Sequence, residues 1–189
     1  MGGSFLDLSQ QSVMIVDDNR HMRALLCSIF RALKIKNLKE VGDGETALLE
    51  IEAFEPTLVV TDWHMEPMDG ISLVKNIRHS ASSSVKYVPI IMLTGHSDLH
   101  RVQEARDSGV HEFMAKPVAA KDLLKRLEAI VGHPRPFIEN DSYFGPDRRR
   151  KNQGPPPGSS ERRDAGGTAS VASDDTLSPE QALASQEPS

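Results

Sequence analysis

The sequence predicts an α/β domain: an open parallel sheet of five strands with helices on both faces. Two observations predict it. Over about residues 10–131, short runs rich in β-branched residues alternate with segments of helical periodicity. The strand candidates are apolar at successive positions, which is typical of strands buried on both faces of a parallel sheet. Parallel strands need crossover connections, and the intervening helices supply them.

The first half of the domain opens with a strand at 12–17, because SVMIVD is a continuous apolar run of strand length. Apolar residues at i, i+3, i+4, i+7, i+8 and i+11 then mark one face of a helix. They are Met22, Leu25, Leu26, Ile29, Phe30 and Leu33. LKEVG at 38–42 indicates a short second strand, GETALLEIEAF at 44–54 a helix, and TLVVTD at 57–62 a third strand.

The second half repeats the alternation. GISLVKNIRH at 70–79 indicates a helix and VPIIML at 88–93 the fourth strand. SDLHRVQEARDSG at 97–109 is a weaker helix with three apolar anchors, followed by a strand in VHEFMA at 110–115 and a helix in AAKDLLKRLEAIV at 119–131. Five strands and five helices in this alternation favour the flavodoxin-like doubly wound order 2-1-3-4-5.

Composition narrows the class of protein. A chain of 189 residues, 38% hydrophobic and 26% charged, is long enough for one ordinary domain. Its formal net charge of -5 gives no general attraction to nucleic acid or to an anionic membrane. A single cysteine excludes an internal disulfide framework and fits a reducing compartment. Without a membrane-spanning or signal-like apolar stretch, we expect a cytoplasmic protein with no membrane partner.

The chain changes character near Gly132. Residues 132–189 are rich in Pro, Ser, Gly and charged residues and have few large apolar ones, so we expect a largely disordered tail. One exception is the segment FIENDSYFGPDRRR, whose aromatic residues are able to dock on a surface. The basic run DRRRK, which overlaps the end of this segment, is read as a solvated charge cluster, with contact to phosphate, nucleic acid or an acidic partner as the alternative.

Polar residues stand where the predicted strands end. Asp17 and Asp18 close the first strand, Asp62 the third and Thr94 the fourth, and Lys116 follows the fifth. In the predicted order these ends converge on one crevice, the usual place for a ligand in such sheets. Three carboxylates at one locus repel one another unless a cation joins them, and oxygen ligands suit Mg²⁺. A lysine and a hydroxyl suit phosphoryl oxygens, so the site is predicted to hold a phosphoryl group on Asp62.

Four motifs occur in a characteristic order: VDDN, TDWHMEPMDG, LTGHS and FMAKP. Together they resemble the receiver domain of bacterial two-component response regulators, in particular the stand-alone type similar to the chemotaxis regulator. The resemblance covers about residues 10–131. It implies a phosphorelay function in which a sensor histidine kinase or histidine phosphotransfer protein donates the phosphoryl group, and a downstream protein reads the result by docking.

The resemblance also assigns roles to single residues. It implies that Asp62 is the phosphorylated aspartate, that Asp18 binds Mg²⁺ directly and that Asp17 is a second acidic contact, partly through water. The main-chain carbonyl of His64 would complete the protein's share of the metal shell. Thr94 would hydrogen-bond the phosphoryl group, and Lys116 would pair with it. Phe113 would be the aromatic switch residue, and Lys116-Pro117 a cis peptide.

The sequence departs from the family pattern in the loop after Asp62, where Glu66 stands in place of the usual proline and Pro67 follows. His64 and His96, each two residues beyond a site residue, occupy positions that resemble tuning sites for loss of the phosphoryl group. The stretch SASSSVK at 80–86 is longer than usual and suggests an exposed loop.

Three other functions stay open on the sequence alone. A phosphatase or phosphotransferase of the haloacid-dehalogenase class uses similar groups, but it needs a second aspartate where this chain has His64. A receiver-like module that binds partners without phosphorylation is the second. Binding of nucleic acid or an acidic partner through the tail is the third, and it requires an affinity that falls steeply with salt. We expect no enzymatic activity beyond the chain's own phosphorylation and dephosphorylation.

Overall fold

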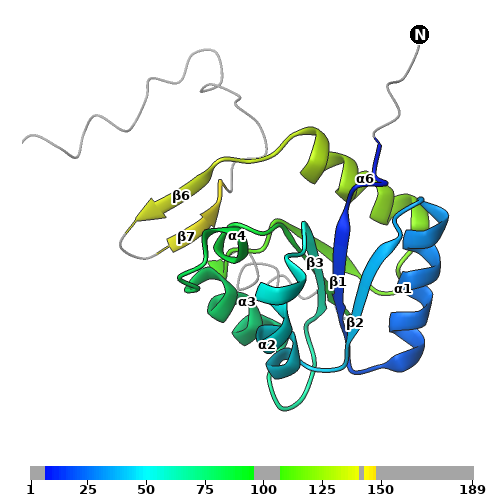
Figure 1. Ribbon diagram of the computed structural model, residues 1–189, viewed down its shortest axis with the longest axis horizontal. Helices are drawn as coiled ribbons and strands as arrows, with labels where there is room; N and C mark the ends of the chain where they lie inside the picture. Colours follow the sequence, from blue (N-terminus) through cyan, green and yellow to red (C-terminus); the bar gives the residue numbers. More distant parts are fainter. Residues whose placement is uncertain (1–6, 96–106, 141–142, 148–189) are drawn as a thin grey trace, which may run out of the picture. The chain divides into compact units, whose positions relative to one another are not determined.

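The computed structural model describes residues 7–95, 107–140 and 143–147 (Figure 1). Its main sheet has five parallel strands in the order β2-β1-β3-β4-β5, which confirms the predicted topology. The strands are β1 (Ser12–Val16), β2 (Asn37–Val41), β3 (Leu58–Asp62), β4 (Ile90–Thr94) and β5 (Glu112–Ala115). All four neighbouring pairs are parallel, and β1 lies between β2 and β3.

Three of the described helices begin at a residue whose side chain caps them. Asn19 accepts backbone hydrogen bonds at the start of α1 (Arg20–Ala32), and Asp43 does the same for α2 (Gly44–Phe54). Asp69 caps α3 (Gly70–Arg78) through the amide of Ser72, at 2.7 Å. The remaining described helices are α4 (Ser83–Lys86) and α6 (Ala120–Gly132).

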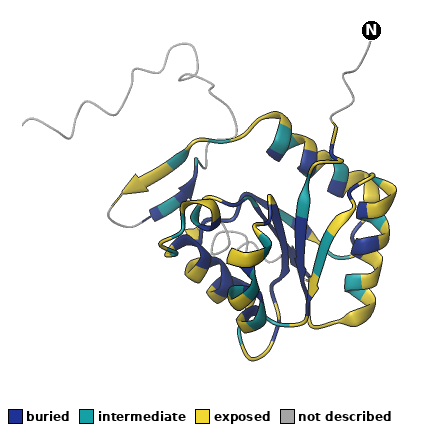
Figure 2. Cartoon of the chain, in the orientation of Figure 1, coloured by how far each residue is buried: buried dark blue, intermediate teal, exposed yellow. Residues whose placement is uncertain are grey.

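The core has two layers, one on each face of the sheet (Figure 2). Alternate strand residues point to opposite faces. Met14 and Val16 pack with residues of α2 and α3, whereas Val13 and Ile15 pack with residues of α1 and α6. Figure 1 shows α1 and α6 on the side of the sheet away from α2 and α3. The sheet is therefore covered on both faces, as the apolar strands predict.

One predicted segment differs from the expectation, and another lies mostly outside the described residues. The stretch 80–86 is not a simple exposed loop, because α4 forms within it and buries Val85 against the core. The helix expected at 97–109 falls mostly on residues 96–106, which lie outside the described part of the chain.

A second, two-stranded sheet follows α6 and corrects the expected extent of the tail. β6 (Phe137–Asn140) pairs antiparallel with β7 (Tyr143–Pro146), so these two strands form a hairpin. The aromatic segment, predicted as the exception within a largely disordered 132–189, therefore packs in this hairpin, and the expected domain end at residue 131 falls too early. Residues 148–189 lie outside the described residues.

The hairpin packs on the amino-terminal side of β5. Tyr143 is buried, and a side-chain carbon added at Gly145 would lie 2.8 Å from the Cα of Gly109. The two backbones therefore approach too closely for larger residues. Phe137 stacks edge-on against Tyr87 with ring centroids 4.9 Å apart.

Two arginines anchor the hairpin region. Arg78 is buried and donates to the carbonyl oxygens of Gly109 at 2.9 Å and Lys86 at 2.9 Å, and its guanidinium faces the Phe137 ring. Arg135, just before β6, forms an ion pair with the buried carboxylate of Glu112. These contacts make the hairpin a packed extension of the domain.

No helix in the described ranges is long and apolar enough to span a bilayer.

Candidate functional site

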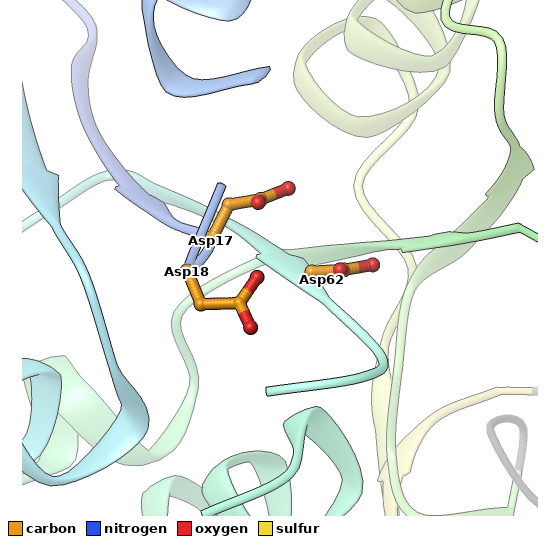
Figure 3. A group of neighbouring side chains, drawn as sticks. All are labelled: Asp17, Asp18 and Asp62. Atoms are coloured by element: carbon orange, nitrogen blue, oxygen red, sulfur yellow. The ribbon is translucent and has the colours of Figure 1, made fainter. Parts of the chain in front are cut away.

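Three carboxylates gather at the carboxyl edge of the sheet. Asp17 and Asp18 follow β1, and Asp62 is the last residue of β3 (Figure 3). One carboxylate oxygen from each lies within 4.8 Å of the others. Asp17 is fully buried and Asp62 is 7% exposed, whereas Asp18 is exposed to solvent. The structure therefore brings together the three acidic residues that the sequence places at the strand ends.

Backbone hydrogen bonds hold two of these carboxylates in place. Asp17 Oδ1 accepts from the amide of Asn19 at 2.8 Å, and Asp62 Oδ1 accepts from the amide of Trp63 at 2.8 Å. Each carboxylate thus keeps its second oxygen for another partner.

The loop after Asp62 brings the backbone at position 70 so close to the end of β3 that only glycine fits there. A side-chain carbon at Gly70 would overlap the carbonyl oxygen of Asp62, and its amide donates to the carbonyl of Trp63 at 2.9 Å. Sequence reasoning did not single out this glycine, although its place after MD in the loop motif was a signal. It lets the first turn of α3 close against the end of β3.

Lys116 connects the carboxylates across the crevice. Its Nζ lies 2.9 Å from Asp62 Oδ2 and 3.0 Å from Asp17 Oδ2, and its backbone amide donates to Thr94 at 2.6 Å. Burial opposes its charge, but the hydrogen bonds to Asp62 and Asp17 outweigh burial and raise the pKa of the ammonium. Lys116 is therefore protonated at neutral pH.

The surroundings of Asp17 disfavour its ionised form. Burial raises the pKa of this carboxyl above its usual value, and the hydrogen bonds from Lys116 and the Asn19 amide only partly offset that effect. With all three carboxylates ionised, three negative charges face one ammonium, a formal charge of -2. The site has a deficit of positive charge.

Thr94 and Phe113 stand beside this cluster. Thr94 ends β4, next to β3, and is completely buried. Phe113 on β5 is partly buried and meets Trp63 edge-on, with ring centroids 6.2 Å apart and an interplanar angle of 87°. The aromatic ring therefore contacts the residue that directly follows Asp62.

Of the two histidines predicted to tune loss of the phosphoryl group, the structure describes only His64. His64 is exposed in the loop after β3, two residues beyond Asp62. His96 lies outside the described residues, so its role stays a prediction.

The expected cis bond at Lys116-Pro117 is present, and Glu66-Pro67 is also cis, in the loop where the sequence departs from the family pattern.

The donor set fits a hard divalent cation. Carboxylate and carbonyl oxygens are the ligands that Mg²⁺ prefers, and the three aspartates supply oxygens within one ion's reach. The excess negative charge and the raised pKa of Asp17 both favour an added cation. Asp17, Asp18 and Asp62 are the side chains that would hold it.

The family model for the response regulator receiver domain matches residues 13–128. The chain belongs to this family. Receiver domains act in phosphorelay signal transduction, and this receiver has that function.

Two similar curated proteins are chemotaxis proteins. The receiver is 37% identical to chemotaxis protein CheY-3 of Vibrio cholerae over 118 residues, which are 62% of this chain and 89% of the relative. It is 34% identical to chemotaxis protein CheY of Pseudomonas aeruginosa over 118 residues, 62% of this chain and 94% of the relative.

Solved structures agree with the fold. Chemotaxis protein CheY4 of Vibrio cholerae is 26% identical with a TM-score of 0.59, and the match covers 64% of this chain and 98% of that one. The receiver domain of sensor histidine kinase PA1611 from Pseudomonas aeruginosa is 25% identical with a TM-score of 0.59, and the match covers 65% of this chain and 98% of that domain. That receiver domain has a magnesium ion coordinated in its active site cleft. The hairpin at 137–146 lies beyond the family match.

Proposed function

We propose that Asp62 accepts a phosphoryl group, with Mg²⁺ bound beside it, from a histidine kinase or histidine phosphotransfer protein. The observation that carries this proposal is the shared ammonium of Lys116, 2.9 Å from Asp62 and 3.0 Å from Asp17. It faces the second oxygen of Asp62, whose first oxygen is held by the Trp63 amide. One oxygen is thereby fixed while the other adjoins a positive charge.

The transfer is a displacement at phosphorus. A carboxylate oxygen of Asp62 forms a bond to phosphorus as the bond from phosphorus to the donor imidazole breaks, and the imidazole leaves with the electron pair. Lys116, beside Oδ2 of Asp62, would stabilise the charge that builds up on the phosphoryl oxygens. A bound Mg²⁺ would offset the repulsion between the carboxylates and the incoming phosphoryl group.

The switch follows from added charge at Asp62. Thr94 ends the neighbouring strand and would hydrogen-bond the phosphoryl oxygens, and Phe113 packs on Trp63. Phosphorylation then shifts an existing equilibrium between two arrangements of these residues. A downstream protein reads the shift by docking. Exposed His64 tunes hydrolysis of the acyl phosphate, and the chain catalyses no other reaction.

Beryllofluoride tests this proposal because it forms a stable mimic of a phosphorylated aspartate. Trp63, the single tryptophan of the chain, directly follows Asp62 and reports binding through its fluorescence. We expect a saturable, Mg²⁺-dependent response in the wild type and none in Asp62→Asn. An equal response in both proteins, or none in a folded wild type, would refute Asp62 as the acceptor and favour a module that binds without phosphorylation.

A further inference from the structure

Arg23 reaches back from the first turn of α1 to the turn that carries Asp17 and Asp18. Its Nη1 donates to the carbonyl oxygen of Asp17 at 2.7 Å and to that of Asp18 at 3.3 Å. The side chain is 19% exposed, and Nε lies 3.9 Å from Glu40 on β2. One guanidinium therefore binds the main chain of two of the three candidate metal ligands.

The turn needs such support because little else described in the structure fixes Asp18. Asp17 is tied by its amide to Val41 at 3.2 Å and by its carboxylate to Asn19. Asp18 is exposed, and its carbonyl oxygen accepts from Arg23. By holding the carbonyl oxygens of both residues, Arg23 opposes movement of the turn that carries the two carboxylates.

Two physical effects of Arg23 act in opposite directions. By fixing the turn, it places two carboxylates for a cation before the cation arrives, which raises affinity. By adding positive charge near three carboxylates, it repels a cation and lowers affinity. The guanidinium bonds to carbonyl oxygens and leans toward Glu40, so part of its charge is offset locally. We therefore expect positioning to be the larger effect.

We propose that Arg23 is a positioning residue that sets the orientation of Asp17 and Asp18 and thereby the affinity of the site for Mg²⁺. This role rests on the proposed function, since it requires the metal site. Arg23 acts through the backbone of Asp17 and Asp18.

The test is a Mg²⁺ titration of the full chain followed by Trp63 fluorescence, without a phosphodonor. Loss of a group that orients metal ligands costs on the order of tenfold in affinity, so the Kd of Arg23→Gln is expected to rise about tenfold. Arg23→Lys keeps the charge and bonds to fewer oxygens, so its Kd rises less. Arg31→Gln is the matched control: it removes the same charge from an exposed position of α1, eight residues and about 12 Å further on, and its Kd stays unchanged.

The outcomes separate the two effects. Tighter Mg²⁺ binding by Arg23→Gln would show that charge dominates and overturn the proposal, as would an unchanged Kd with only a lower melting temperature. If Arg23→Gln fails to fold, Arg23→Lys decides, because an unchanged Kd in that variant overturns the positioning role. A folded wild type without a Mg²⁺ response would overturn the proposed function together with this role. A wild-type response with unchanged variants overturns the role of Arg23 alone.

Discussion

His111 makes the stability of the domain depend on pH in a way the structure specifies. It is 8% exposed, and its Nδ1 accepts from the backbone amide of Ile90 at 3.2 Å. Burial, together with the charges of Arg78 and Arg135, lowers the pKa of His111 from 6.5 to about 3. A proton on Nδ1 would also break the bond from Ile90. The imidazole is therefore neutral in the folded protein over the whole physiological range.

The sign of the effect follows from proton uptake. Between about pH 6.5 and 3 the unfolded chain binds a proton at His111 that the folded chain does not, so the free energy of unfolding falls as pH falls through this window. Each pH unit is worth about 1.4 kcal/mol per group. From about pH 7.5 to about pH 5, the loss from His111 is about 2 kcal/mol.

Urea unfolding of the wild type and His111→Asn at both pH values measures this loss. Asparagine offers an oxygen to the Ile90 amide and does not titrate. We expect the wild type to lose about 2 kcal/mol more than the variant between the two pH values. Equal losses in the two proteins would refute the reasoning, since they would show that His111 is protonated in the folded state or contributes nothing.

Substitutions at three further sites test other parts of the structure. Lys116→Met removes the ammonium 2.9 Å from Asp62, so the rate of phosphoryl uptake from a small donor should fall about 100-fold; a rate near that of the wild type would contradict the role of Lys116. Gly70→Ala forces a carbon against the Asp62 carbonyl and should cost about 3 kcal/mol in urea unfolding; an unchanged midpoint would show that the loop yields freely. Tyr143→Ala empties a buried site in the hairpin and should cost about 3 kcal/mol, against about 1 kcal/mol for Tyr143→Phe, which loses the bond to Pro146. If Trp63 fluorescence shows no change in the midpoint for Tyr143→Ala, the hairpin unfolds separately from the domain.

The strand ends were predictable because one rule places them. Apolar runs fix the strands, the alternation with helices fixes a parallel sheet, and parallel strands bring their carboxyl ends to one edge. Asp17, Asp62 and Lys116 therefore meet in the structure as the sequence predicts. The starts of α1, α2 and α3 were also predictable, since Asn19, Asp43 and Asp69 are of residue types that favour helix caps.

The hairpin was harder to predict because its burial depends on distant residues. Tyr143 is buried where β7 approaches Gly109, and Phe137 faces the guanidinium of Arg78, which is itself buried at the end of α3. Nothing in the local composition of 132–147 reveals these partners. Leu25 shows the converse: its helical spacing predicts a core position, but it is 46% exposed because the sheet meets α1 through Leu26 and Phe30.

The most direct test of the central claim is covalent uptake from acetyl phosphate, followed by mass spectrometry of the intact chain and its peptides. The proposed function predicts that the wild type gains one phosphoryl group on the peptide containing Asp62, that a chelator of Mg²⁺ abolishes the gain, and that folded Asp62→Asn shows none. Equal uptake by Asp62→Asn, or uptake that survives the chelator, would contradict the claim that Asp62 is a Mg²⁺-dependent phosphoacceptor.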